Sequence, residues 1–210
     1  MDNEKIKKGW HANGSGECPF KNRSCKVEPL REIKHVKAIK KLLVNCPRDF
    51  ALFVLSINTG LRANDVLSLK WVDVLDENEI KAKLKIQEAK TGIIKEIVLC
   101  SNSQEALQSL LDSVGKPKMD SYIFGSRKGK GKMTLQCLNQ LINKWTKAAA
   151  IKGNFGSQSL RKTFAHFALR KGLDIHKLMK TLKHLTPSIT LRFAGVEKED
   201  WNKTLLRLNL

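Results

Sequence analysis

Two different spacings of apolar residues divide this chain, and the division limits the folds that it can adopt. Through most of the chain apolar residues recur every three or four positions, as in Ile33, Val36, Ile39 and Leu43, which is the spacing of an amphipathic helix. Between residues 82 and 86 they alternate with lysines instead, which predicts a strand with one basic face. The fold class predicted is therefore mainly α with a small antiparallel β-sheet inserted early.

Turn residues and apolar runs predict where the elements lie. Thr91-Gly92 is a turn before a return strand at residues 93–99, so a hairpin is expected, with Lys90 just before its turn. Pro47 opens and Gly60 closes a nearly continuous apolar segment, which predicts a helix buried on most sides. Further helices are expected at residues 65–69, 107–111, 135–149, 160–168 and 175–182.

The first 28 residues differ from the rest, because they are rich in Gly, Asn and Lys and show no periodicity. We interpret 1–28 as an irregular N-terminal tail and 29–210 as one domain. His11, Cys18 and Cys25 lie in this tail, but a zinc site usually shows closely spaced cysteine pairs and four ligands. Free thiols in an irregular segment are therefore the preferred interpretation, and no metal site is predicted.

The charge of the chain indicates its class of partner. Lys and Arg total 39 against 20 Asp and Glu, a net charge of +19. Such a charge attracts polyanions and makes binding to nucleic acid salt-sensitive. A merely basic protein and, less favoured, a protein of membrane surfaces are the alternatives. The basic segment Ser126–Lys132, which contains Arg127, Lys128, Lys130 and Lys132, is either a phosphate-gripping loop or a solvated one.

Several classes of protein are disfavoured. The longest apolar run, Phe50–Leu55, is far too short to cross a membrane. The N-terminus lacks the apolar core of a secretory signal. The five cysteines are odd in number and form no tight pairs, which suits a reducing compartment better than a disulfide framework. A cytoplasmic location is expected.

Three polar residues stand among apolar neighbours. Arg62 follows the most buried segment, Arg161 lies beside Leu160, and His184 closes a helical pattern. A buried guanidinium needs an anionic partner. Asp65 is one candidate partner for Arg62. Two arginines with a histidine and a lysine are equally suited to one phosphate, because Arg binds phosphate oxygens through two parallel hydrogen bonds.

Four short motifs together resemble the tyrosine recombinases of the phage integrase family. Thr59-Gly60-Leu61-Arg62 with Asp65 is similar to the family's first box, and Ala89-Lys90-Thr91-Gly92 to its lysine hairpin. Residues 159–164, Ser-Leu-Arg-Lys-Thr-Phe, resemble the second box. Leu182-Lys183-His184 followed by residues 187–196 resembles the third. The motifs occur in the family's order over residues 30–208, so the resemblance implies the tyrosine recombinase catalytic-domain fold.

The resemblance also implies a mechanism. In active members two arginines hold the scissile phosphate, and they match Arg62 and Arg161. A hairpin lysine, matching Lys90, donates a proton to the leaving oxygen. A histidine, matching His184, hydrogen-bonds the phosphate, and a tyrosine attacks the phosphorus to form a covalent intermediate. The family needs no metal and no cofactor, so none is expected.

Two positions depart from the family pattern. Nine residues after His184, where the tyrosine belongs, stands Phe193, which keeps the ring and lacks the attacking oxygen. The second-box histidine falls on Gln158, which can hydrogen-bond a phosphate and cannot exchange a proton at neutral pH. Tyr122, the single tyrosine of the chain, is interpreted as a packing residue. A naturally altered member is favoured over an engineered one.

These observations predict an integrase-like protein that binds duplex DNA, cradles a backbone phosphate and is deficient in strand transfer. A non-catalytic DNA-binding module or regulator derived from an integrase is the alternative, and a purely structural protein is the least favoured. Lys162, beside Arg161, is a further candidate for a DNA contact. The segment Asp200–Leu210 either joins copies of the chain into an oligomer on DNA or packs on its own domain. Only about 28 residues precede the domain, where integrases usually carry a separate DNA-binding domain. Either the sequence is a fragment, or the protein binds DNA with half of the usual clamp, which predicts weaker and less specific binding.

Overall fold

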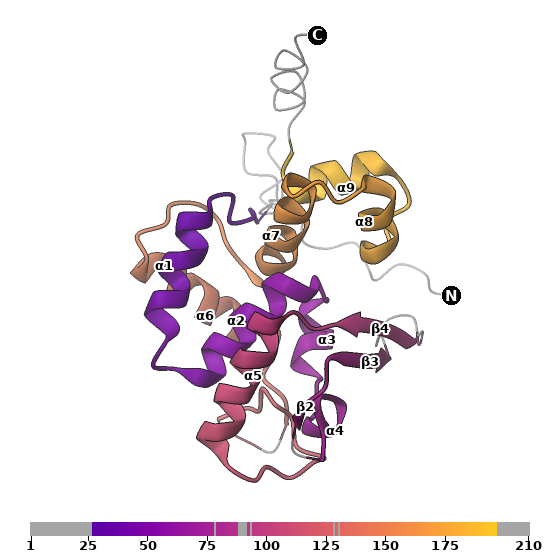
Figure 1. Ribbon diagram of the computed structural model, residues 1–210. Coiled ribbons are helices and arrows are strands. Elements are labelled where there is room, and N and C mark those ends of the chain that lie inside the picture. The colour runs from indigo at the N-terminus through magenta and orange to yellow at the C-terminus, as the bar shows by residue number, and fades with distance from the viewer. Residues whose placement is uncertain are drawn as a thin grey trace, which may run out of the picture.

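The computed structural model describes residues 27–77, 79–87, 92, 94–127, 129 and 131–196. This part of the chain is mostly helical and contains two small antiparallel sheets of two strands each (Figure 1). The elements in chain order are α1 (Ile33–Leu43), α2 (Pro47–Thr59), α3 (Ala63–Leu67), α4 (Trp71–Val74), β1 (Leu75–Asp76), β2 (Glu79–Ile80), β3 (Lys83–Gln87), β4 (Ile94–Val98), α5 (Ser101–Val114), α6 (Leu135–Ala148), α7 (Ser157–Arg170), α8 (Ile175–Leu182) and α9 (Pro187–Ala194). The predicted fold class is confirmed, with two hairpins in place of one small sheet.

Helix α2 is the centre of the larger hydrophobic core. Five consecutive residues, Ala51–Leu55, are fully buried, because α2 packs against α1, α3, α5 and α7. Pro47 opens the helix, where its missing amide hydrogen is not needed. The rings of Phe53 and of Trp145 on α6 pack edge to face, with centroids 6.0 Å apart. The predicted helix buried on most sides is thus confirmed.

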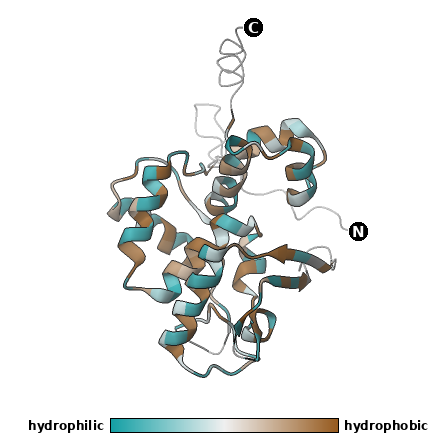
Figure 2. Ribbon diagram, viewed as in Figure 1, coloured by the Kyte–Doolittle hydropathy of each residue, from teal (hydrophilic) through white to brown (hydrophobic). Residues whose placement is uncertain are grey.

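The helices around α2 are amphipathic. Apolar and polar segments alternate along them (Figure 2), and α1 buries Val36, Ile39 and Leu43. This is the spacing from which the helix was predicted. Their apolar stripes close the core over α2, and their polar faces remain in solvent.

The β3–β4 hairpin matches the prediction from alternating residues. Leu84 pairs with Ile97 in the antiparallel register, and both are buried. Lys83 and Lys85 on the opposite face are exposed. Gly92 has a φ of 67°, which favours glycine in the turn. The strands lie within one residue of the predicted positions, and residues 88–91, including Lys90, lie outside the described residues.

Helices α7, α8 and α9 form a second, smaller hydrophobic cluster. Its buried members are Ala165, Leu178, Leu182 and Ala194, with Phe164 and Phe193 among the half-buried residues packed on them. In Figure 1, α8 and α9 (yellow) lie beyond α7 and away from α1, α5 and α6. Helix α7 contacts α2 on one side and both α8 and α9 on the other, so it joins the two clusters.

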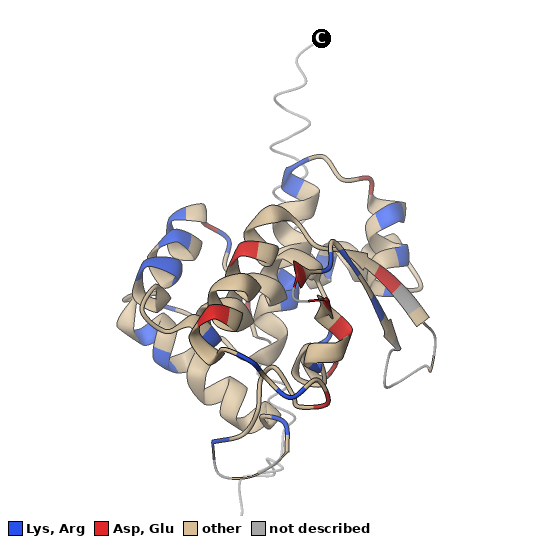
Figure 3. Cartoon of the chain, turned by 60° about the horizontal axis from the view of Figure 1, so that its bottom comes forward, with Lys and Arg blue, Asp and Glu red and all other residues tan. Residues whose placement is uncertain are grey.

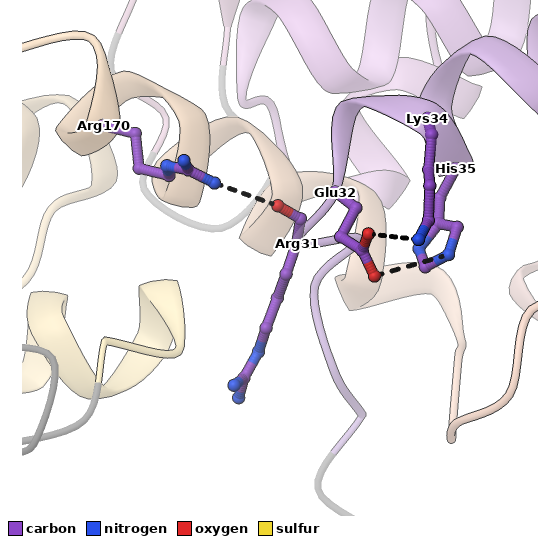
Figure 4. A network of polar contacts seen from close by, with 5 residues as sticks. All are labelled: Arg31, Glu32, Lys34, His35 and Arg170. Carbon is purple, nitrogen blue, oxygen red and sulfur yellow. Dashed lines mark hydrogen bonds and ion pairs between the residues drawn. The ribbon is translucent and has the colours of Figure 1, made fainter.

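The segment before α1 ties α7 to the larger core. The guanidinium of Arg170 on α7 donates to the carbonyl of Arg31 at 3.5 Å, and Glu32 pairs with Lys34 at 2.6 Å and lies 3.7 Å from His35 (Figure 4). The backbone amide of Leu30 donates to the hydroxyl of Thr163 at 2.8 Å. The exposed ion pair contributes little, whereas the buried hydrogen bond to Thr163 fixes the segment against α7.

Some short elements differ from the predictions. The helix expected at residues 65–69 is α3, which begins and ends two residues earlier. No element was predicted for α4, β1, β2 or α9. Most of the expected irregular tail, residues 1–26, lies outside the described residues. Within the part of the chain that is described, none of the helices has the length and apolar character needed to cross a membrane.

Candidate functional site

A pocket of about 570 Å³ lies where α3, α7, α8 and α9 meet. Its lining includes five of the six predicted catalytic positions: Arg62, Gln158, Arg161, His184 and Phe193. The sixth, Lys90, lies outside the described residues. Residues from four separate stretches of sequence therefore converge on one hollow, which periodicity alone does not predict.

Arg62 is positioned by the sharp end of α2. Gly60 ends that helix in the left-handed conformation, with φ of 61°, and a Cβ there would overlap the ring of Phe164. Glycine is therefore required on both counts. The chain then extends through Arg62, at the start of α3, so the half-buried Arg62 side chain lines the pocket.

Arg161 and Gln158 come from the first turns of α7. They are three residues apart and so share one face of the helix. A guanidinium nitrogen of Arg161, Nη2, donates to the carbonyl of Leu182 at 2.8 Å, at the carboxyl end of α8, where a positive charge is favoured. This bond fixes the half-buried Arg161 while it still lines the pocket. Gln158 is exposed at the same wall.

His184 follows the turn that ends α8. Its amide donates to the carbonyl of Met179 at 3.0 Å, and its ring nitrogen Nδ1 lies 3.1 Å from the hydroxyl of Thr190. That hydroxyl lies 3.4 Å from the carbonyl of Thr186, to which it donates, so the contacts favour the tautomer with hydrogen on Nδ1. Burial lowers the pKa of His184, and the charges of Arg161 and Arg62 lower it further.

Phe193 lies between His184 and Lys162. The His184 and Phe193 rings meet edge to face, with centroids 4.9 Å apart and planes 71° apart. Nζ of Lys162 lies 5.6 Å from the Phe193 centroid and donates to the carbonyl of Val27 at 2.7 Å. The predicted DNA contact of Lys162 would have to compete with these contacts within the chain, and it stays a prediction.

The pocket is electropositive. Among the described residues of its lining, Arg62, Arg161 and Lys183 are basic and Asp65 is acidic. Asp65 is buried, and its charge offsets part of the positive charge of the two arginines. The remaining positive charge suits an anion with several oxygens, such as a phosphodiester. Along the described chain, Lys and Arg positions (blue) are also more frequent than Asp and Glu positions (red) (Figure 3).

The other predicted residues lie apart from the pocket or outside the described residues. Arg127 is exposed, and Nζ of Lys132 donates to the hydroxyl of Ser68 at 2.7 Å. Lys128, Lys130 and the segment 200–210 lie outside the described residues. Tyr122 pairs with Lys70 in an isolated bridge and does not line the pocket, which fits its interpretation as a packing residue. No cluster of three or more possible metal ligands occurs among the described residues.

The structure also adds residues that sequence reasoning missed. Asn64, Leu135, Ser157 and Lys183 line the pocket as well. Lys183 belongs to the third box, and its position next to His184 in the sequence was the one signal that it lines the pocket. Leu135 and Asn64 carried no such signal, because their approach to the pocket depends on how α6 and α3 pack.

Comparison with known proteins gives consistent results. The model of the phage integrase family matches residues 28–200. The "Probable integrase/recombinase YoeC" of Bacillus subtilis (strain 168) is 27% identical over 174 residues, which cover 82% of this chain and 92% of the relative.

Two solved structures share the fold. The crystal structure of the XerA recombinase matches with a TM-score of 0.71 and 20% identity, over 87% of this chain and 64% of that one. The XerH site-specific recombinase bound to palindromic difH substrate matches with a TM-score of 0.66 and 20% identity, over 82% of this chain and 49% of that one. This chain thus spans about half to two thirds of these recombinases. With the family model matched over most of its length, the chain belongs to the phage integrase family, as a tyrosine recombinase catalytic domain.

Proposed function

We propose that this chain is a site-specific recombinase- or integrase-like protein that binds duplex DNA and holds a backbone phosphate in the pocket. One observation carries the proposal: Arg62, Arg161, His184 and Phe193 line the same hollow. In this account the protein does not transfer strands as it stands, because Phe193 has no oxygen with which to attack phosphorus. The Tn1549 transposon integrase, whose structure shares this fold with a TM-score of 0.60, was solved in complex with transposon right end DNA, which supports the choice of partner.

Each residue has a proposed role. The two guanidiniums bind nonbridging oxygens of the phosphate and stabilise negative charge on them. His184 donates to the phosphate when protonated, since its neutral tautomer holds its hydrogen towards Thr190. Gln158 donates through its amide. Lys90 is proposed as the proton donor to the leaving oxygen, on the resemblance alone. No metal or cofactor takes part in this scheme.

The test is binding to duplex DNA over a series of salt concentrations, followed by fluorescence anisotropy. We expect Arg161→Ala to weaken binding by about ten- to a hundredfold, because it removes a charged hydrogen-bond donor from the pocket. Arg127→Ala, in the exposed loop, is the matched control and is expected to cost about threefold or less. Circular dichroism of both variants is the check that they are folded.

Two results would contradict the proposal. Equal losses from Arg161→Ala and Arg127→Ala would show that the pocket has no special part in binding. Affinity that does not fall as salt rises would show that phosphates are not the main contacts, because counterion release makes phosphate binding strongly salt-dependent.

A second function, a non-catalytic DNA-binding module or regulator, is favoured by Phe193 and Gln158 together. Two catalytic groups lost from one pocket are what a chain released from catalysis would show. For this function the pocket serves affinity alone, so Phe193→Tyr would bind DNA and leave it uncut. Assembly of copies on DNA through residues 200–210, and a cytoplasmic location, remain predictions from the sequence.

A further inference from the structure

Lys183 adopts a backbone conformation that lysine seldom takes. It ends α8 with φ of 57° and ψ of 47°, the left-handed region. The amide of the next residue, His184, donates back to the carbonyl of Met179 at 3.0 Å. This is the hydrogen-bond pattern of a helix end at which glycine is the usual left-handed residue. A lysine there costs conformational energy that glycine would avoid.

Two other helices in the described part of the chain end in the left-handed conformation, and both do so at a glycine. Gly60 ends α2 and Gly195 ends α9 in the same conformation. Two further residues with side chains, Glu77 and Ala150, have a positive φ elsewhere in the described part of the chain, and neither lines the pocket. Strain is therefore tolerated in this fold, and it is the position of Lys183 on the pocket that sets this lysine apart.

The charge of the pocket explains what the side chain of Lys183 provides. Lys183 is exposed and lines the pocket with Arg62 and Arg161. The resemblance to recombinases expects a histidine at position 158, where this chain has the neutral Gln158. Burial together with the two arginines also lowers the pKa of His184 and disfavours its cationic form. Lys183 is a basic residue, so it supplies positive charge that these two residues do not.

We infer that Lys183 binds a backbone phosphate of DNA at the rim of the pocket, beside the phosphate held by Arg62 and Arg161; this rests on the proposed function. The exposed, flexible lysine side chain presents a point charge that suits a phosphate in solvent. The turn that orients His184 thereby also places a phosphate-binding cation. Lys183 contributes to affinity without reading sequence.

The test uses a substitution for which stability and binding should change in different directions. Lys183→Gly removes the cation and the strain together, so its melting temperature is expected to hold or rise. Its affinity for a fixed DNA duplex should fall roughly three- to tenfold at low salt. The slope of log affinity against log salt concentration should become shallower by about one, the loss of one phosphate contact.

The controls separate strain from charge. Ala150→Gly relieves the same kind of strain away from the pocket and should leave both affinity and slope unchanged. Lys183→Arg keeps the charge and should retain the binding of the unaltered chain. Lys177→Ala removes an exposed lysine from α8 itself, so it measures the loss of DNA affinity that comes from a lower net charge alone. That loss should be smaller than the loss with Lys183→Gly.

The outcomes distinguish this inference from the proposed function. Should Arg161→Ala weaken binding while Lys183→Gly binds as Ala150→Gly does, the phosphate pocket stands and the role of Lys183 is wrong. A fall in melting temperature with Lys183→Gly would show that the lysine stabilises the helix end, and would likewise overturn the inference. Absence of salt-dependent DNA binding by the unaltered chain would overturn both the inference about Lys183 and the proposed function.

Discussion

The two hydrophobic clusters of the domain differ greatly in extent. The larger one gathers apolar side chains from α1 to α7 and from β1, β3 and β4, and α2 lies at its centre. The smaller one has four buried members, all on α7, α8 and α9. Since stability grows with buried apolar area, the larger cluster should hold the fold. The smaller one should hold α8 and α9 more weakly.

The pocket lies between these two clusters. Arg62 comes from the turn after α2, on the larger cluster. Lys183 and His184 come from the end of α8 and Phe193 from α9, on the smaller. Arg161 lies on α7, which contacts both, and bonds to the end of α8 at 2.8 Å. Segments that carry functional residues are often the less stable parts of a fold. Assembly of the site should therefore depend on how well the smaller cluster is packed.

The largest effect is expected from truncation in the larger cluster. Phe53 is fully buried and meets Trp145 edge to face, so Phe53→Ala leaves a cavity at the centre of the fold. We expect the free energy of unfolding to fall by about 3–5 kcal/mol, measured by urea denaturation. If Phe53→Ala lowered the free energy of unfolding less than Leu178→Ala in the smaller cluster, the comparison between the two clusters would be reversed.

An intermediate effect is expected from the same kind of change in the smaller cluster. Leu178 is fully buried, and Leu178→Ala should cost about 2–3 kcal/mol. Amide hydrogen exchange should show that α8 and α9 lose protection first while α2 and α5 keep theirs. Uniform loss of protection across all of these helices would show that the two clusters unfold as one unit.

The smallest effect is expected from pH. Burial lowers the pKa of His166, partly offset by its bond to the carbonyl of Ala194, and burial also lowers that of His184. The folded chain thus prefers neutral rings, so the unfolded chain takes up protons first as pH falls below about 6.5. The free energy of unfolding should decrease as the pH falls from 7.5 to 5.5. Its slope against pH should correspond to an uptake of at most about two protons on unfolding.

The source of this pH dependence can be localised. His166 is buried, with Nδ1 3.1 Å from the carbonyl of Ala194. The slope should be shallower in His166→Gln, followed by urea denaturation at each pH. An unchanged slope in this variant, or stability that rises as the pH falls, would be contrary to the lowered pKa values.

The sequence predicted the long elements of both clusters better than the short ones. Long amphipathic patterns such as those of α1 and α6 identify a helix because several turns repeat the same spacing. Helix α4 and strands β1 and β2 are too short to show a period. Helix α9 did carry a start signal in Thr186-Pro187, where Thr186 accepts from the amide of Ile189 at 3.3 Å, but its eight residues gave only a weak pattern.

The site was predicted through the resemblance rather than through physical rules. Nothing in periodicity brings Arg62 to His184, since their approach depends on how α7 packs between the two clusters. The recombinase motifs supplied that expectation, and the pocket contains residues of three of the four motifs, while Lys90 lies outside the described residues. The left-handed conformation of Lys183 had no signal in the residue type, because lysine is not favoured there. It follows from the turn that places His184.

The most direct measurement for the central claim restores the missing oxygen. The unaltered chain and its Phe193→Tyr variant are incubated with nicked suicide duplexes drawn from DNA that flanks the gene. A covalent protein–DNA band is then sought on a denaturing gel. Phe193→Tyr with Arg161→Ala is the negative control, and Phe193→Tyr with Gln158→His should strengthen any band by restoring a proton-exchanging group.

We predict a covalent band with Phe193→Tyr and none with the unaltered chain, because in the proposed function the pocket binds the phosphate and Phe193 withholds the attacking oxygen. A band from the unaltered chain would contradict the account, since Tyr122 or another residue would then be the attacking group. Salt-sensitive binding by Phe193→Tyr without any band would contradict it as well, and would favour the non-catalytic DNA-binding module.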